Sequence, residues 1–373
     1  MPSEISPAEA LVRHRAGAVL VDVRDARERE SGTAEGALGI DRAALEAEPT
    51  AHLPDAAAEI LLICQSGRRS ALAATVLAGL GYERVATVAG GTSAWEAAGL
   101  PMARPGIDED FADRYSRHLR LPEIGLAGQR KLQDSRMLLL GAGGLGSPAA
   151  YYLAAAGVGI LRIADDDRVE RSNLQRQILH TEAAIGSRKV DSAARAVSAL
   201  NPRTRIEAVA ERVTSDNVER LLDGVDLVID GADNFPVRYL LNDACVKLAK
   251  PLVYGAVHRF QGQVSVFDAG RHRGSQPCYR CLFPEPPAAE DAPSCSEAGV
   301  LGVLPGIIGL LQATEALKVV LGIGEPLAGR VLHLDALAMR FRETRLPPDP
   351  QCVVCAPGRA FPGYTDYEAF CAG

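Results

Sequence analysis

Cys64 has the sequence surroundings of a reactive thiol. It follows an apolar run at residues 60–63, which predicts a buried strand, and it precedes Gln-Ser-Gly-Arg-Arg-Ser and a small-residue helix predicted at 71–80. A helix N-terminus and the neighbouring Arg68 and Arg69 lower a thiol pKa, because both favour the thiolate. The pattern indicates a nucleophilic cysteine; the alternative is a buried, unreactive side chain.

Three spaced glycines form a second candidate site. The apolar run at residues 136–140 leads into Gly141, Gly143 and Gly146, and residues 148–156 predict a helix. Gly141 permits a sharp exit from the strand, Gly143 lets the backbone approach a ligand, and Gly146 lets the helix pack on the strand. Free N–H groups at the helix start would face an anion. This pattern predicts a nucleotide-binding α/β unit, with a merely structural turn as the alternative.

Polar residues downstream favour a triphosphate as the ligand. A strand predicted at residues 160–164 ends at Asp165, where a ribose-binding carboxylate is expected roughly 20 residues past the glycines. Arg176 and Lys189 can balance phosphate charge, and Asn173 can bond the transferred group or its neighbours. A dehydrogenase that binds a dinucleotide is the alternative, although it has no obvious need for this polar cluster.

Acidic residues also follow the next predicted strand, residues 225–229, in the segment Asp-Gly-Ala-Asp-Asn that ends at Asn234. An acid at the carboxyl end of a parallel strand would face the same crevice as the glycines, which suits a magnesium ligand.

Four cysteines form two pairs with metal-binding spacing: Cys278 with Cys281, and Cys352 with Cys355. Four thiolates fill the tetrahedral coordination of zinc and leave no vacancy, so we expect a structural zinc site that ties the C-terminal segment to the domain. A redox cysteine pair is the alternative, but neither pair has the βαβ context of such motifs.

Composition limits the classes of protein to consider. The chain has 373 residues, 47% of them hydrophobic and 5% aromatic, which fits an ordinary α/β protein of two or three domains. A formal net charge of -7 argues against nucleic-acid binding. Without a long uncharged apolar run or a signal peptide, we expect a cytoplasmic protein with no membrane segment. Eight cysteines then point to metal or catalysis before disulfides.

The elements that must position these residues predict two α/β domains. Strands and helices alternate through the first hundred residues, and the polar stretch around Pro105 and Gly106 predicts a linker. We expect a small domain at residues 1–103, a linker at 104–111 and a larger Rossmann-like domain at 112–373.

The first segment resembles the rhodanese domain, a small sulfurtransferase fold. The matching motifs are Asp22-Val-Arg24 with Glu28, the loop Cys64-x-x-Gly67-x-Arg69, and Gly90-Gly91 followed by Trp95. The resemblance implies that Cys64 carries sulfur as a persulfide. Similar phosphatases have a loop one residue longer, usually with a histidine before the cysteine. Here Ile63 precedes the cysteine and Arg69 closes the short loop, which favours sulfur over phosphate.

The larger segment, from about residue 110 to 356, resembles the MoeB/ThiF family of adenylyltransferases, which activate ubiquitin-like sulfur-carrier proteins. The matching motifs begin with Arg114-Tyr115-x-Arg117-His118 and the glycine motif, and continue through Asp165-x-Asp167 and Ala232-Asp-Asn234. The cysteine pairs and the segment from Ser172 to Gln177 also match. The resemblance implies that ATP and Mg²⁺ are held by residues of these motifs: Gly141, Gly143, Gly144, Gly146, Asp165, Ser172, Asn173, Leu174, Gln175, Arg176, Lys189, Asp233 and Asn234.

The same resemblance assigns two further residues. Arg117 would reach across a homodimer interface to the partner's phosphates. Cys295 would accept the activated carboxylate as a thioester or receive sulfur as a disulfide, although some members dispense with it. Two departures stand out: fused members mostly carry the rhodanese domain after the adenylating domain, and the loop reads Cys-Gln rather than the commoner Cys-Arg.

These implications predict one reaction sequence. The chain would adenylate the C-terminal glycine of a carrier and then transfer sulfur from Cys64, after loading by a cysteine desulfurase persulfide or by thiosulfate. We expect a carrier of molybdopterin synthesis, with carriers of thiamine, cysteine or thiolated tRNA synthesis as alternatives. The rhodanese domain could also be inert beside a working adenylating domain. A non-enzymatic scaffold that only docks carriers is the remaining hypothesis.

Overall fold

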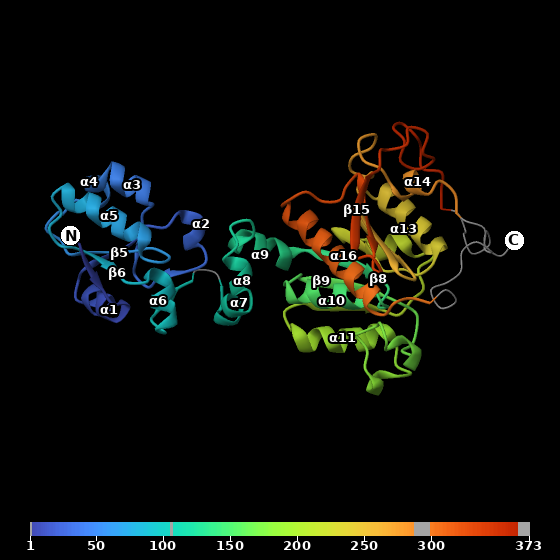
Figure 1. Ribbon diagram of the computed structural model, residues 1–373, viewed down its shortest axis with the longest axis horizontal. Helices are drawn as coiled ribbons and strands as arrows, with labels where there is room; N and C mark the ends of the chain where they lie inside the picture. The colour runs from blue at the N-terminus through green and yellow to red at the C-terminus, as the bar shows by residue number, and fades with distance from the viewer. Residues whose placement is uncertain (1, 105–106, 287–298, 365–373) are drawn as a thin grey trace. The chain divides into compact units, whose positions relative to one another are not determined.

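The computed structural model describes residues 2–104, 107–286 and 299–364, and the chain divides into two compact units, residues 1–129 and 130–373 (Figure 1). The division groups three short helices with the first unit: α7 (Glu109–Arg114), α8 (Ser116–Leu119) and part of α9 (Gly125–Asp134). Phe111, Tyr115 and Leu126 form a small apolar cluster among these helices. The domain boundary predicted at residues 104–111 stays a prediction.

The first unit is built on a five-stranded parallel sheet with the order β1-β6-β5-β2-β4. Its strands are β1 (Ser3–Ile5), β2 (Val19–Asp22), β4 (Leu38–Gly39), β5 (Ile60–Ile63) and β6 (Val85–Val88). A separate antiparallel pair joins β3 (Thr33–Ala34) to β7 (Met102–Ala103). Its helices are α1 (Pro7–Arg15), α2 (Ala26–Arg29), α3 (Arg42–Ala47), α4 (Pro49–His52), α5 (Arg68–Gly79) and α6 (Gly91–Ala97).

The central strand β5 is apolar at every position because both of its faces are buried. Ile60 and Leu62 pack in one buried cluster with residues of α3 and α5, whereas Leu61 and Ile63 pack in a second cluster with residues of α1 and α6. A parallel strand covered on both faces needs apolar side chains at every position. The strand therefore delivers Cys64, the next residue, into a buried environment.

The second unit is built on an eight-stranded sheet with the order β10-β9-β8-β11-β12-β13-β14-β15. The first five strands in this order run parallel, and those from β12 to β15 pair antiparallel. The strands are β8 (Arg136–Leu140), β9 (Ile160–Ala164), β10 (Arg205–Val209), β11 (Leu227–Asp230), β12 (Leu252–His258), β13 (Gln261–Phe267), β14 (Arg330–Asp335) and β15 (Arg340–Arg345).

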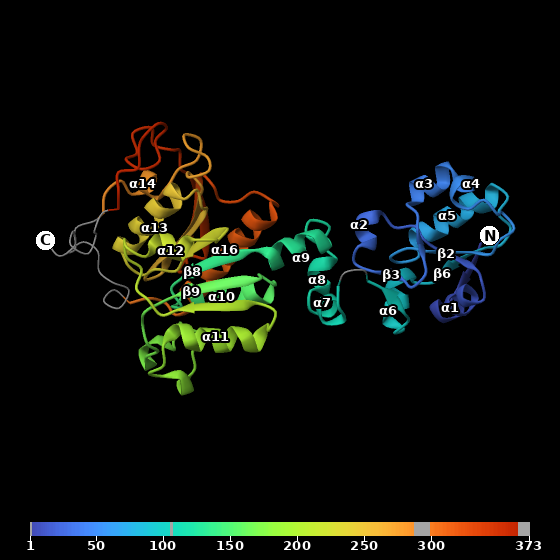
Figure 2. The ribbon, with the colours of Figure 1, turned by 180° about the vertical axis from the view of Figure 1, so that it is seen from behind.

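Helices cover both faces of this sheet (Figures 1 and 2). Helices α10 (Gly146–Ala155), α11 (Lys189–Leu200) and α16 (Val303–Leu321) contribute to one core cluster. Helices α12 (Val218–Leu222), α13 (Phe235–Lys247) and α14 (Tyr279–Leu282) contribute to the other. Two 3₁₀ turns, η1 (Arg171–Asn173) and η2 (Glu182–Ala184), lie between β9 and α11.

The strand order reverses beside β8. The chain moves from β8 to β9 and β10 on one side, and then returns to β11 and β12 on the other side. Ligands of open α/β sheets bind at such a switch point, outside the carboxyl ends of the strands. The residues after β8, β9 and β11 are the glycine motif, Asp165 and the segment 231–234, so the topology brings the three predicted parts of the nucleotide site together.

Helix α16 is long and apolar enough to cross a membrane by length and composition alone, as judged over the described residues. Its Leu304, Ile308 and Ala316 lie in the core of the second unit, and 44% of its most apolar window is buried. A helix that is apolar on most of its surface is typical of a core position as well as of a membrane span. Here the packing accounts for the composition.

Candidate functional site

The thiol of Cys64 lies in a loop that supplies hydrogen-bond donors. The residue is 1% exposed, and its Sγ accepts hydrogen bonds from Ser70 N at 3.4 Å and from Ser70 Oγ at 3.5 Å. Burial raises the pKa of this thiol, but the bonds from Ser70 and from the N–H groups of Ser66 and Arg69 outweigh burial and lower the pKa below its ordinary value. The loop therefore favours the nucleophilic thiolate.

Glycines shape this loop. Gly67 is the N-cap residue before α5 and has φ +88°, a left-handed conformation that glycine adopts without strain. Gly91 also has a positive φ, and a Cβ there would lie 1.9 Å from Cys64 O. Thr92 N donates to that same carbonyl oxygen at 2.8 Å. Gly91 and the hydrogen bond from Thr92 therefore hold the start of the loop at Cys64.

One arginine of the loop is also paired with a carboxylate. Arg69 forms a double hydrogen bond with Glu28, one arm at 2.7 Å, and this pairing lowers the Glu28 pKa to about 2. Much of the Arg69 charge is thus directed at a carboxylate. Gln65 accepts from Arg24 Nη1 at 3.1 Å and donates to Ser93 Oγ at 2.8 Å. The Gln that departs from the family pattern ties the loop to its surroundings.

A cavity of about 320 Å³ lies at the switch point of the second unit. Eight of the thirteen residues predicted to bind nucleotide line it: Gly141, Gly143, Gly144, Asp165, Arg176, Lys189, Asp233 and Asn234. The other five lie outside the lining: Gly146, Ser172, Asn173, Leu174 and Gln175. The sequence motifs thus located the pocket, and also included residues that do not line it.

Three glycines of the motif each have a different geometric role. Gly141 has φ +90°, and a Cβ there would lie 2.7 Å from Gly231 O. A Cβ at Gly146 would lie 1.9 Å from Gly141 O, so only glycine lets α10 pack this close to the strand exit. A Cβ at Gly143 would meet nothing closer than 3.7 Å. That position leaves the open backbone that an approaching phosphate needs.

Asp165 and Lys189 form the polar wall of the pocket. Asp165 Oδ2 accepts from Ala142 N at 2.8 Å, so the carboxylate also fixes the glycine motif. Burial raises the Asp165 pKa, while the positive charge of Lys189 opposes that rise. Lys189 Nζ bonds Asp167 Oδ2 at 2.7 Å, and its side chain is 7% exposed. A buried ammonium beside a cavity is suited to a phosphate ligand.

The segment from Ser172 to Arg176 is held by its own hydrogen bonds. Asn173 Oδ1 accepts from Glu170 N at 3.0 Å, and Asn173 is buried. Arg176 Nη1 donates to Ser172 O at 3.1 Å, and Arg176 lines the cavity. Asn173 therefore orders the turn in this structure, and Arg176 is the member of the segment that faces the ligand space.

Asp233 and Asn234 lie in the loop between β11 and α13. Asn234 Oδ1 accepts from Val237 N at 3.1 Å, which makes it the N-cap of α13. Asp233 is exposed and accepts from Asn234 Nδ2 at 3.3 Å. Its carboxylate is available at the cavity for a cation, whereas the Asn234 oxygen is occupied by the cap.

Two buried residues at this site did not emerge from the sequence motifs. His180 joins the glycine motif to α11: one ring nitrogen lies 2.9 Å from Ala142 O and the other 3.0 Å from Ser192 Oγ. Arg238 lines the cavity and lies 3.6 Å from Asp230. His180 and Arg238 each stand a few residues after a recognised motif, and that proximity was the available signal.

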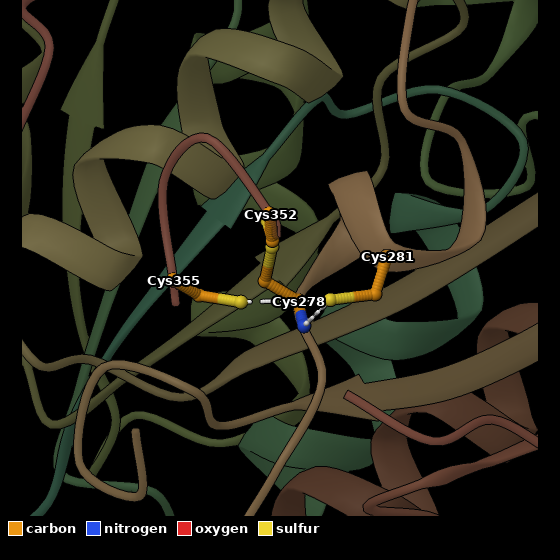
Figure 3. A group of neighbouring side chains, drawn as sticks. All are labelled: Cys278, Cys281, Cys352 and Cys355. Atoms are coloured by element: carbon orange, nitrogen blue, oxygen red, sulfur yellow. Dashed lines mark hydrogen bonds between the residues drawn. The ribbon is translucent and has the colours of Figure 1, made fainter. Parts of the chain in front are cut away.

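The two cysteine pairs meet, as Figure 3 shows. The four Sγ atoms lie within 4.8 Å of one another. Cys278 Sγ lies 3.6 Å from Cys352 Sγ, and Cys281 Sγ lies 3.5 Å from Cys355 Sγ. Tetrahedral zinc with Zn–S bonds of about 2.3 Å requires sulfur separations of about 3.8 Å. The donor set and its spacing therefore fit a tetrahedral metal ion, and the sulfurs are too far apart for disulfides.

The structure does not test the predicted roles of two catalytic residues, Arg117 and Cys295. Arg117 lies on α8 in the first unit, and its predicted role across a homodimer stays a prediction. Cys295 lies outside the described residues.

Comparison with known proteins supports both units. Residues 115–354 match the ThiF family, and residues 6–98 match the rhodanese-like domain. The chain is 51% identical over 260 residues to the sulfur carrier protein adenylyltransferase of Thermus thermophilus, an alignment that spans 69% of this chain and 96% of that relative. It is 48% identical over 269 residues to the adenylyltransferase and sulfurtransferase MOCS3-1 of Zea mays, spanning 71% and 57% of the two chains.

A solved structure of another protein has a similar fold. The crystal structure of E. coli MccB superposes with a TM-score of 0.59 at 18% identity, and the match covers 72% of this chain and 84% of that chain. The predicted fold class, a Rossmann-like ThiF domain with a rhodanese domain, is confirmed.

Proposed function

Because the chain belongs to the ThiF family of adenylyltransferases and also carries a rhodanese-like domain, we propose that it adenylates and then sulfurates a ubiquitin-like sulfur-carrier protein. The observation that carries the proposal is the cavity at the switch point. It combines the open backbone at Gly143 with Arg176, Lys189 and the Asp233 carboxylate.

In the first step, the C-terminal glycine carboxylate of the carrier attacks the α-phosphate of ATP. A carboxyl–phosphate bond forms, the bond to the β-phosphate breaks, and pyrophosphate leaves with its electron pair. The attacking carboxylate is already ionised, so no general base is needed. Arg176 and Lys189 offset the charge that develops on the phosphate, and the glycine motif holds the nucleotide in place.

In the second step, a persulfide on Cys64 attacks the carbonyl of the carrier adenylate and releases AMP. The product is an acyl disulfide between carrier and Cys64. Attack of a thiol, for which we propose Cys295, on the Cys64 sulfur releases the carrier thiocarboxylate and leaves a disulfide that a thiol reductant restores. A cysteine desulfurase persulfide or thiosulfate would load Cys64 for the next cycle.

Two metal ions belong to this proposal. Asp233 would hold Mg²⁺ with the phosphates, where the ion supplies charge neutralisation. The four cysteines would hold a structural Zn²⁺, for which their spacing fits. We further propose a cytoplasmic homodimer in which Arg117 of each subunit serves the other's nucleotide, and we place the linker at residues 104–111. A carrier of molybdopterin synthesis is our first choice, with thiamine, cysteine and thiolated tRNA carriers as alternatives.

The test mixes purified enzyme with ATP, magnesium and each candidate carrier in turn. We expect ATP–pyrophosphate exchange with the true carrier, and a carrier mass increased by the replacement of oxygen with sulfur once a sulfur donor is added. Absence of exchange with every carrier would overturn adenylation. Exchange with unchanged thiocarboxylate yield in Cys64→Ser would show that the rhodanese domain is inert.

A further inference from the structure

The buried pair Arg238 and Asp230 lies directly behind the loop that carries Asp233. Asp230 is the last residue of β11 and is 1% exposed, and Arg238 lies in the first turns of α13 and is 9% exposed. Arg238 Nε lies 3.6 Å from Asp230 Oδ2. A buried ion pair gives little net stability relative to apolar residues, so its presence beside a ligand cavity calls for another reason.

The pair controls the backbone of the intervening loop, residues 231–234. Asp230 Oδ1 accepts from Ala232 N at 2.9 Å, and Arg238 Nη2 donates to Ala232 O at 2.8 Å. The peptide groups on both sides of Ala232 are thus held by the two charged side chains. Asp233 is the next residue, so its carboxylate follows any movement of this backbone.

Residues of strand β12 and helix α16 contact Arg238 and Asp230. The Arg238 guanidinium packs over the ring of Tyr254 with a centroid distance of 5.7 Å, and Nη2 lies 3.5 Å from Gly255 O on β12. On the other side, Gln312 of α16 donates to Asp230 O at 2.6 Å. The pair is therefore held by β12 and α16 as well as by its bonds to the loop.

The same loop also touches the glycine motif. Gly231 N donates to Leu140 O at 2.8 Å, and a Cβ on Gly231 would lie 2.6 Å from that oxygen. A shift of Gly231 would therefore disturb the exit of β8. A displacement of about 1 Å at a catalytic group can cost about a hundredfold in rate.

We propose that Arg238 and Asp230 are positioning residues for adenylation: they fix the loop 231–234 so that Asp233 and the glycine motif keep one geometry around the nucleotide. This inference rests on the proposed function for its kinetic part. The loop geometry itself is independent of which carboxylate the enzyme activates.

The test uses variants that separate positioning from folding. Removing one partner of a buried pair leaves an unpaired charge and can unfold the chain, so the main variant is the double replacement Asp230→Asn with Arg238→Met, which keeps similar volumes and removes both charges. Arg238→Lys keeps the cation but loses the fork that reaches Asp230 and Ala232 O together. Lys247→Met, at the C-terminal end of the same helix, is the matched control.

Hydrogen exchange measured by mass spectrometry reads the loop directly. We expect the peptide that covers residues 231–237 to exchange at least about tenfold faster in the double variant than in the full-length parent, with the control variant unchanged, because each lost bond to a charged group releases the loop. Equal exchange in parent and double variant would overturn the proposal. This readout needs no carrier and no turnover.

The kinetics of ATP–pyrophosphate exchange measure the effect of the released loop on adenylation. We expect kcat to fall about a hundredfold in the double variant and in Arg238→Lys, with the KM for ATP changed less than about threefold and melting of Arg238→Lys close to the parent. Unchanged kcat in both variants would overturn the positioning role. If the parent itself shows no exchange, the proposed function fails, and the hydrogen-exchange result still decides whether the pair orders the loop.

Discussion

At the scale of single residues, hydrogen-bond donors lower the pKa of the Cys64 thiol even though burial opposes them. Arg69 is paired with Glu28, and the hydrogen bonds from Ser70 and the loop N–H groups lower the thiol pKa. Each such bond favours the charged form over the neutral one. The lowered pKa therefore depends in part on Ser70, a residue that has no charge.

Replacing Ser70 with alanine tests this account. We expect the pH–rate profile of thiosulfate-to-cyanide sulfurtransfer to rise at higher pH in Ser70→Ala, by about one pH unit for a lost bond to a charged group. The sign follows from the lowered pKa: the parent thiol ionises below its ordinary range, and the variant returns toward it. Ultraviolet titration of the thiolate gives an independent midpoint. Thr75→Ala, on an exposed face of the same helix, serves as the control, and an identical profile in Ser70→Ala would contradict the prediction.

Lys189 is the corresponding residue in the nucleotide pocket. Its ammonium is nearly buried and bonds Asp167, so a phosphate would meet a cation that is already oriented. We expect Lys189→Met to weaken ATP binding about 10- to 100-fold, the loss typical of a hydrogen bond to a charged group. Calorimetric titration with ATP measures this, and Lys131→Met, on α9 outside the cavity lining, is the control. Equal affinity in parent and Lys189→Met would show that bound ATP does not interact with the Lys189 ammonium.

At the scale of elements, the sequence predicts the strands and motifs. It does not predict the helix start at Arg68 or the tertiary contacts of Arg238. The strand before Cys64 and the strand at residues 160–164 occur as expected, because continuous apolar runs predict buried parallel strands. Helix α5 begins at Arg68, three residues before the predicted start, because Gly67 turns the chain in a left-handed conformation that periodicity does not reveal. Arg238 was missed because its partners come from β11, β12 and the loop between β11 and α13, a set that only the folded chain brings together.

The cysteine cluster is linked to helix α13. Tyr279 N donates to Asn242 Oδ1 at 2.8 Å, and Arg280 bonds both oxygens of Asp243, each at 2.8 Å. Tyr279 and Arg280 stand between the first two cysteines, and Asn242 and Asp243 lie on the helix whose first turns border the nucleotide cavity. The cysteine cluster and the cavity thus share one helix.

Replacing one ligand tests the metal assignment. We expect Cys352→Ser to lose bound zinc and to release the segment around residues 352–364, because three thiolates no longer complete the tetrahedral site. Elemental analysis measures the zinc, and limited proteolysis measures release of the segment. Cys64→Ser, which leaves the four ligands intact, is the control. A variant with unchanged zinc content and melting would refute the assignment.

At the scale of the whole molecule, the chain joins two units that each have their own core and their own candidate site. The thiol of Cys64 is held by residues of the first unit, and the cavity with Asp233 is lined by residues of the second. In the proposed reaction the two sites act in sequence on one carrier. Because the cores are separate, damage confined to one site need not reach the other.

This separation predicts a division of labour that point variants can expose. We expect Asp233→Ala to abolish ATP–pyrophosphate exchange, because it removes the carboxylate that we propose to hold Mg²⁺ at the cavity, while thiosulfate sulfurtransfer through Cys64 continues at the parent rate. Cys64→Ser should do the reverse and keep exchange while it loses sulfurtransfer. Both assays run on the same preparations, with circular dichroism to show that each variant is folded. Loss of both activities in a folded Asp233→Ala protein would mean that the rhodanese site depends on the nucleotide site, and the two-step scheme would then need a coupled mechanism.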